Sequence, residues 1–212
     1  MNPPHQAPVA LLASGGLDST VLAYWLSSKG FDVYPIFIDY GQHCAKIELQ
    51  TAKTVLPPTI RDRIEVLHLG DVFSSSKSLL ISETNLWERE VSADELILPY
   101  RNLFFLVSGC ARAATLGLRH LYSAFINSNH AAEIDAGRAF LDGVHKLTLG
   151  VGGVSIEMPF RDMSKTEVAQ LGISLSAPVA HTYSCQANSA SHCGACPNCV
   201  DRLTALQAIH ET

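Results

Sequence analysis

One segment near the N-terminus constrains the fold of this chain more than any other. The apolar run Val9–Ala13 is typical of a buried strand, and it passes directly into the glycine turn 14–16 and then into a helix start at 17–20. This order directs backbone amides, hydroxyls and a helix N-terminus at one point, which is how proteins hold a pyrophosphate. It is neither a Walker sequence nor a G-x-G-x-x-G sequence. The alternative is an ordinary strand-to-helix turn capped by Asp18 or Ser19.

The string S-G-G-L-D-S resembles the signature loop of the ATP pyrophosphatase families, which cleave ATP between the α- and β-phosphates. Asp18 is better suited to hold Mg²⁺ than to contact phosphate oxygens, because two anions need a cation between them. The residues expected at this nucleotide site are Ser14, Gly15, Gly16, Leu17, Asp18, Ser19 and Thr20.

Composition restricts the class of protein. The chain has 212 residues, 47% of them hydrophobic and 17% charged, which predicts one compact domain, or one domain with a small appendage. A formal net charge of −5 argues against a nucleic-acid partner, which normally requires a basic excess. No apolar run reaches the roughly 18 residues that span a bilayer. The N-terminus lacks the basic region of a signal peptide, so we expect a cytoplasmic protein without a membrane partner.

Short apolar runs alternate with amphipathic stretches, which predicts an α/β fold with a doubly wound, mainly parallel sheet. In such sheets, ligands bind beyond the carboxyl ends of the strands. Residues 70–99 break the alternation and are predicted to form a long excursion over an active site. We expect an α/β domain over 1–180 and a small region with a C-terminal helix over 181–212. The expected strands are 8–13, 31–39, 63–68, 120–126 and 154–158, and the expected helices are 19–29, 46–55, 103–116, 133–146 and 165–171, the last ended by Gly172.

Four of the six cysteines crowd together near the C-terminus, in the spacing Cys-x₇-Cys-x₂-Cys-x₂-Cys. Four thiolates suit a tetrahedral Zn²⁺ with no open position, so the metal is expected to be structural. His192 is a conceivable substitute ligand, although four cysteines already complete the coordination shell. The predicted ligands are Cys185, Cys193, Cys196 and Cys199.

Two further segments carry candidate ligand contacts. Arg101 and Asn102 follow a proline at a predicted helix start, where a cation and an amide can bind an anionic or base-like ligand. Lys165 lies in the first turn of a helix capped by Ser164, where a cation opposes the helix dipole. Such a placement suggests a phosphate contact, together with Arg161. In each case the alternative is an ordinary surface or capping residue.

Taken together, these sites resemble the 7-cyano-7-deazaguanine synthase family, the ATP-dependent, zinc-containing ligases of the queuosine (deazapurine) pathway. The matching elements are the segments 14–20, 39–42, 99–102, 159–167 and 183–185 with the three later cysteines. The resemblance implies an adenine nucleotide alpha hydrolase-like fold, the cofactors ATP, Mg²⁺ and Zn²⁺, and a homodimer. It implies a reaction in which the carboxylate of 7-carboxy-7-deazaguanine is adenylated and ammonia displaces AMP, giving the amide and then the nitrile.

The resemblance also implies roles for individual residues. Catalysis would fall to Ser14, Asp18 and Lys165. Nucleotide contacts outside the glycine loop would come from Asp39, Gln42, Arg101, Asn102, Arg161 and Lys165. Substrate contacts would come from Tyr40, Arg101, Asn127 and Asp135.

The chain departs from the family pattern at two places. His43-Cys44-Ala45 follows Gly-Gln where the family usually has Arg-His, and the loop 127–138 lacks the usual Tyr-Pro-Asp-Cys-Arg stretch. Three alternatives therefore stay open. They are a divergent relative that joins a deazapurine acid to another amine, a tRNA sulfur-transfer enzyme with the same ATP loop, and a zinc-bearing binding module without catalysis.

Overall fold

The computed structural model describes residues 6–82, 93–126, 135–186 and 191–210. The strands are β1 (Gln6–Leu12), β2 (Phe31–Asp39), β3 (Glu65–His68), β4 (His120–Tyr122) and β5 (Ser155–Glu157). The helices are α1 (Leu17–Ser28), α2 (Ala45–Val55), α3 (Pro58–Arg61), α4 (Gly70–Phe73), α5 (Arg101–Thr115), α6 (Arg138–Gly152), α7 (Lys165–Ser174) and α8 (Pro197–His210), with 3₁₀ turns at Ala93–Leu96 and Val179–His181.

The five strands form one parallel sheet in the order β3-β2-β1-β4-β5. The first strand is central, since β1 pairs with β2 on one side and with β4 on the other. The strand order therefore reverses at β1, and the loop after β1 lies at the switch point where doubly wound sheets bind ligands. The predicted fold class is confirmed.

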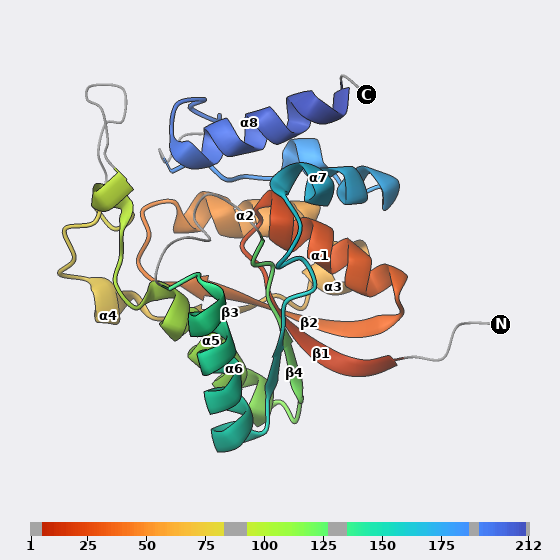
Figure 1. Ribbon diagram of the computed structural model, residues 1–212, viewed down its shortest axis with the longest axis vertical. Helices are drawn as coiled ribbons and strands as arrows, with labels where there is room; N and C mark the ends of the chain where they lie inside the picture. The colour runs from red at the N-terminus through yellow and green to blue at the C-terminus, as the bar shows by residue number, and fades with distance from the viewer. Residues whose placement is uncertain (1–5, 83–92, 127–134, 187–190, 211–212) are drawn as a thin grey trace.

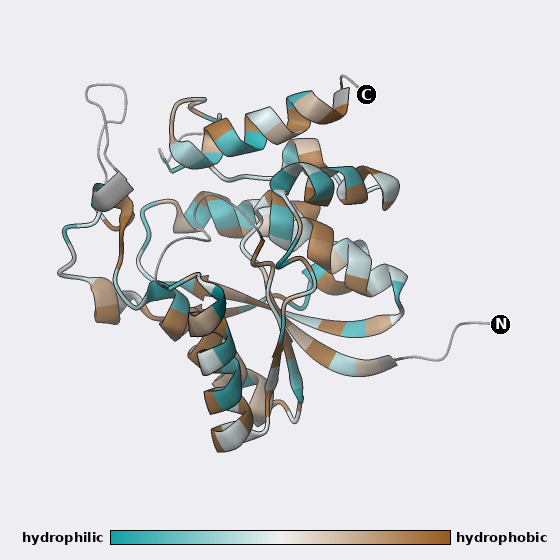
Figure 2. Cartoon of the chain, viewed as in Figure 1, coloured by the Kyte–Doolittle hydropathy of each residue, from teal (hydrophilic) through white to brown (hydrophobic). Residues whose placement is uncertain are grey.

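Helices cover both faces of the sheet (Figure 1). Alternate residues of β1 supply the two cores, because successive side chains of a strand point to opposite faces. Val9 and Leu11 pack with α1, α7 and α8, whereas Ala10 packs with α5 and α6. Figure 2 shows hydrophobic and hydrophilic residues interspersed along α1, α5 and α8, as expected for helices with one buried side. None of the described helices is long and apolar enough to cross a membrane.

Some predicted boundaries need correction. The helix expected over 133–146 begins at Arg138 and extends to Gly152; the first two positions of that prediction lie outside the described residues. The strand expected over 120–126 has regular pairing only to Tyr122. The excursion over 70–99 is partly ordered by an apolar cluster of Phe73, Leu80 and Leu98, while its positions 83–92 lie outside the described residues. The boundary predicted near residue 180 stays a prediction.

The prediction that Gly172 ends its helix is wrong. Helix α7 continues to Ser174, and Gly172 is buried within it. A Cβ atom at this position would lie 2.6 Å from Cγ1 of Val179 and 2.7 Å from Cγ2 of Val21. The glycine is therefore required by the close packing of α7 on α1, and not by a helix end.

We expect Gly172→Ala to lower the free energy of unfolding by about 1–3 kcal/mol, the usual cost of an overpacked core. The matched control is Gly143→Ala in α6, where a Cβ atom would meet nothing within 4 Å. That control should raise the free energy of unfolding by about 0.5–1 kcal/mol, because alanine favours a helix interior. Urea unfolding followed by circular dichroism measures both. Equal effects of the two substitutions would contradict the packing argument.

Candidate active site

The turn between β1 and α1 depends on Gly15. Its φ is +78°, and a Cβ atom there would lie 2.7 Å from the carbonyl oxygen of Glu48 and 2.8 Å from the amide nitrogen of Ala52. Both contacts are with the backbone of α2, which cannot move aside as a side chain can. A residue other than glycine would therefore push the turn and α2 apart.

Two serines hold the turn in shape beside the N-terminus of α1. The Ser14 and Ser19 hydroxyl oxygens lie 3.1 Å apart, and the Ser14 amide donates to Oγ of Ser19 at 3.2 Å. The Gly16 amide donates to Oγ of Ser14 at 3.3 Å. Gly16 is the N-cap of α1 and brings no capping side chain, so the first-turn amides of α1 remain available to an anion.

Asp18 and Lys165 form an ion pair across this turn. Their Oδ2 and Nζ atoms lie 3.0 Å apart, and both side chains are about one-fifth exposed. The pair explains a lysine in the first turn of α7, where the helix dipole alone would disfavour it. The other oxygen of Asp18, Oδ1, is buried and has no hydrogen-bond partner among the described residues. A free, buried carboxylate oxygen fits a Mg²⁺ ligand, since Mg²⁺ binds through carboxylate oxygens.

Two cavities meet at the glycine turn. The first has a volume of about 260 Å³ and is mostly apolar, with walls from the ends of β1 and β2, from Phe105 of α5 and from Phe125 after β4. The second, of about 280 Å³, is mostly polar and includes Arg101, Lys165 and Ser184. The residues that line both are Ser14, Gly16, Asp18, Tyr40 and Glu48. The site can therefore take one ligand with an apolar ring and a second, polar ligand, in contact with each other at the turn.

Gln42 organises the junction of the cavities. Its Oε1 accepts from the Tyr40 amide at 2.9 Å, and its Nε2 donates to Oε2 of Glu48 at 2.9 Å. Burial raises the pKa of Glu48 above its usual value, against the opposing effects of the Gln42 hydrogen bond and the Arg101 charge. Burial also raises the pKa of the Tyr40 phenol, and the negative charge of Glu48 raises it further. This phenol therefore stays neutral at physiological pH.

The structure does not bring every predicted residue to the cavities. Asp39 accepts from the Gly41 amide at 3.0 Å and from His68, so its carboxylate shapes the turn after β2. Arg161 lies 2.6 Å from Asp142 in a surface ion pair.

Asn102 is buried in the first turn of α5, and its Nδ2 donates to the backbone oxygen of Asp135 at 3.2 Å. Neither residue lines the two cavities. Asn127 lies outside the described residues.

Several cavity residues were missed by the sequence reasoning. In sequence, Glu48 looks like any polar residue of an amphipathic helix. Its place at the cavities results from the tertiary contact between α2 and Gly15, which the sequence alone does not reveal. Ser184 could have been predicted, because it lies directly before the first predicted zinc ligand and within the family element 183–185. The other missed polar residues of the second cavity are Gln186, Asn198 and Asp201.

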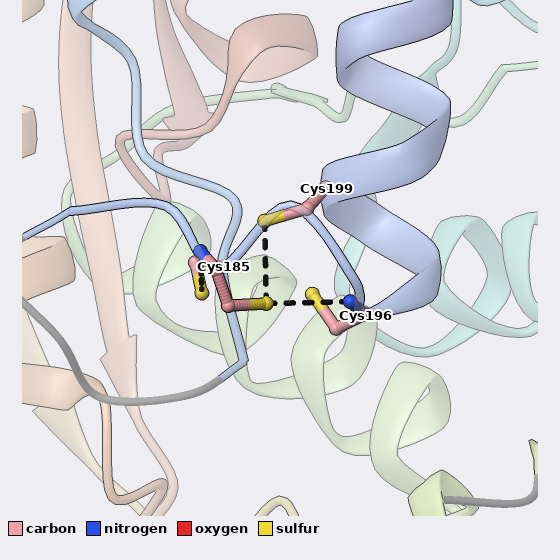
Figure 3. Close-up of side chains that lie close together, drawn as sticks. Cys185, Cys196 and Cys199 are labelled. Carbon is pink, nitrogen blue, oxygen red and sulfur yellow. Dashed lines mark hydrogen bonds between the residues drawn. The ribbon is translucent and has the colours of Figure 1, made fainter. Parts of the chain in front are cut away.

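The four predicted zinc ligands converge. Their sulfur atoms all lie within 4.8 Å of one another, and all four side chains are buried. Figure 3 shows the sulfur atoms of Cys185, Cys196 and Cys199 gathered between the loop before α8 and the first turn of that helix. All six cysteines of the chain are free of disulfides. The cluster fits a closed tetrahedral Zn²⁺ site, and His192 does not belong to it.

Backbone amides support the cluster. The amides of Cys193 and Cys196 donate to the sulfur atoms of Cys185 and Cys193 at 3.4 Å and 3.3 Å. Burial raises the pKa of the Cys199 thiol above its usual value, which disfavours the thiolate unless a cation is bound. A divalent metal supplies that cation.

The cysteine cluster is physically linked to the glycine turn. The Tyr183 amide donates to the Gly15 carbonyl oxygen at 3.0 Å, two residues before Cys185. From the other side of the cluster, buried Arg202 of α8 donates to the carbonyl oxygens of Val179 and Ala180 at 3.2 Å and 2.7 Å. The segment between α7 and the cluster is thus fixed at both ends.

The family model and the curated relatives that match this chain belong to one family. Residues 8–210 match the family model described as queuosine biosynthesis protein QueC. A 7-cyano-7-deazaguanine synthase of Porphyromonas gingivalis is 31% identical over 211 residues, covering 92% of this chain and 90% of that protein. A 7-cyano-7-deazaguanine synthase of Methanoregula boonei is 30% identical over 203 residues, covering 93% of each.

Solved structures support the fold. A 4-thiouridine synthetase in complex with RNA and ATP is similar with a TM-score of 0.53 and 14% identity, over 96% of this chain and 50% of that one. A predicted subunit of a tRNA methyltransferase from Methanocaldococcus jannaschii is similar with a TM-score of 0.52 and 14% identity, over 80% of this chain and 76% of that one. They agree with the adenine nucleotide alpha hydrolase-like fold expected from the sequence.

We expect Cys196→Ser to reduce zinc content and stability together, because the binding energy of a structural zinc is part of the folding energy. The loss should reach several kcal/mol, given that structural zinc contributes about 10–16 kcal/mol in small zinc peptides. Elemental analysis and thermal unfolding measure the two quantities. Cys110→Ser, on the buried side of α5 and away from the cluster, is the control and should keep its zinc. A zinc-free protein with native melting behaviour would contradict the prediction.

Proposed function

Because the chain belongs to the QueC family of queuosine biosynthesis proteins, we propose that it is an ATP-dependent ligase acting on 7-carboxy-7-deazaguanine. The substrate carboxylate attacks the α-phosphorus of ATP, and pyrophosphate leaves. Ammonia then displaces AMP from the acyl-adenylate and gives the amide. A second ATP activates the amide oxygen, and elimination gives the nitrile, 7-cyano-7-deazaguanine.

The observation that carries this proposal is the meeting of an apolar and a polar cavity at the glycine turn. The apolar cavity suits adenine, since its walls include Phe105 and Phe125. The polar cavity suits the acid substrate, because Arg101 offers a fixed cation for a carboxylate. Between them lies the N-terminus of α1, where phosphate groups bind. The carboxylate and the α-phosphorus would therefore meet at the turn.

Each polar residue at the turn would stabilise a different charged group of the reaction. The Ser14 hydroxyl and the first-turn amides of α1 would hold the phosphate oxygens, and Lys165 would neutralise the charge that develops as pyrophosphate leaves. Asp18 would hold Mg²⁺ through its free Oδ1, and the ion would supply further neutralisation of the phosphates. Phosphoryl chemistry of this kind depends on positioning and charge more than on covalent help from the protein.

A second candidate is a ligase that joins the activated acid to an amine other than ammonia. One observation favours it: His43-Cys44 stands where the family usually has Arg-His, and Cys44 is buried against the cysteine cluster, where its thiol donates to the Cys185 carbonyl oxygen at 3.5 Å. The turn after β2 therefore carries His43 in place of the arginine that the family usually has there.

Sulfur transfer to tRNA is supported less well. A catalytic cysteine pair would have to come from Cys44 and Cys110, which belong to different clusters. A homodimer remains a prediction from the resemblance, and a cytoplasmic location remains a prediction from the N-terminal sequence.

We expect Ser14→Ala and Asp18→Ala to abolish AMP formation, because each removes a group that holds the reacting phosphates. Both should leave the thermal unfolding curve nearly unchanged, since neither side chain belongs to the apolar cores. Asp32→Asn is the control for the aspartate. Asp32 forms an ion pair with Arg63 near the start of β2, and the cavities lie at the other end of that strand. Wild-type rates of AMP formation in the Ser14 and Asp18 variants would refute the assignment of the turn.

We expect mass spectrometry to find a deazaguanine amide or nitrile after incubation of the protein with 7-carboxy-7-deazaguanine, ATP, Mg²⁺ and ammonium. Ammonium is the expected nitrogen donor, and omission of it should leave the acid unconverted. A product only in the presence of a primary amine would favour the second candidate. ATP binding without AMP formation on any acid would favour a binding module.

A further inference from the structure

Tyr40 and Glu48 line both cavities, and neither belongs to the glycine turn. In the proposed function, the nucleotide and the acid meet where the cavities join. Groups at the junction therefore lie next to the bonds that form and break. Tyr40 keeps its proton at neutral pH, which leaves Glu48 as the titratable group of this pair that can change its protonation state during the reaction.

The carboxyl group of Glu48 is held in one orientation. It lies in the first turn of α2, and its Oε2 accepts from Nε2 of Gln42 at 2.9 Å. Gln42 is 5% exposed and is itself fixed, because it also donates to the Ile38 carbonyl oxygen at 3.3 Å. Oε1 of Glu48 has no hydrogen-bond partner among the described residues and remains available to a ligand at the junction.

We propose that Glu48 accepts the proton that the attacking amine loses during amination; this inference rests on the proposed function. The nitrogen lone pair forms a bond to the carbonyl carbon of the acyl-adenylate. The carbon–oxygen bond to the phosphate breaks, and its electron pair leaves with AMP. The nitrogen, positively charged after attack, transfers one proton to Oε1 of Glu48. A neutral amide remains.

The charges around Glu48 suit this role. Asp39, at the end of β2, acts on Glu48 through its charge from outside the cavity walls, and Asp18 lines the same cavities from α1; both are acidic. Arg101 of α5 and Lys165 of α7 face the polar cavity as cations. Burial is the largest effect on Glu48 and raises its pKa toward the working pH, where a general base is most effective. Because only the ionised carboxylate accepts a proton, amination at a constant concentration of free ammonia should rise with pH through the pKa of Glu48.

The test separates the two half-reactions in Glu48→Gln. The glutamine side chain keeps an oxygen that can accept from Gln42, so the structural contact is preserved while proton acceptance is lost. Without ammonium, the burst of pyrophosphate from 7-carboxy-7-deazaguanine and ATP should stay within about threefold of wild type. With ammonium, amide formation should fall by about 100-fold or more, the usual contribution of a general base. Glu65→Gln, on β3, is the matched control and should change neither rate.

A second variant keeps the proposal testable if Glu48→Gln folds poorly. Glu48→Asp retains a carboxylate, and it should keep part of the amination rate and the acidic limb of the pH profile. At a constant concentration of free ammonia, the limb should be absent in Glu48→Gln. Zinc content and the thermal unfolding curve report whether either variant is folded.

The outcomes that overturn the proposal are distinct. Equal losses of the pyrophosphate burst and of amide formation would assign Glu48 to nucleotide binding or to structure. An unchanged rate of amide formation in Glu48→Gln, or an unchanged pH profile, would exclude proton acceptance. Failure of the wild-type protein to release pyrophosphate with the acid would instead remove the proposed function, and this inference with it.

Discussion

The close approach of Gly15 to α2 determines how the rest of the site is built. With a Cβ atom only 2.7 Å from a backbone oxygen, this turn tolerates no side chain, and the absence of one lets α2 reach the carboxyl end of β1. That approach brings Glu48 beside the phosphate-binding turn. It also leaves the Gly15 carbonyl oxygen free to accept from Tyr183, which ties the segment before the zinc ligands to the same point. Three distant parts of the sequence thus meet at one glycine.

The electrostatic character of the site follows from where these parts meet. A turn that presents amides to a phosphate attracts anions, and both proposed substrates are anionic. Lys165 and Arg101 offset this excess of negative charge from two separate helices. Lys165 is held in an unfavourable place near a helix N-terminus only because Asp18 pairs with it. In the proposed function, this ion pair would hold the Lys165 cation beside the phosphates, and Asp18 would be the residue that holds the metal.

The sequence predicted the parts of the site that are encoded locally. A strand, a glycine turn and a helix start can be recognised within twelve residues. Four cysteines with short spacings likewise predict a metal site without knowledge of the fold. Residues whose role depends on tertiary contacts were less predictable. The place of Glu48 at the cavities could be recognised only from the packing of α2 against Gly15. Arg161, which was predicted to contact a phosphate, instead pairs with Asp142. Gly172 misled for the same reason, since a buried glycine and a helix-ending glycine look alike in sequence.

Hydrogen bonds connect the cysteine cluster to the rest of the candidate site. Cys185 lies two residues beyond a backbone hydrogen bond to the glycine turn, and Cys199 lies three residues before Arg202, which holds the carbonyl oxygens at the end of the preceding 3₁₀ turn. Asn198 and Asp201, in the wall of the polar cavity, flank Cys199 on α8, so the cluster and this wall share one helix. A metal bound by the four cysteines would therefore support the wall of the polar cavity even without an open coordination position. Its influence would fall on the acid-binding cavity, because α8 contributes nothing to the walls of the apolar one.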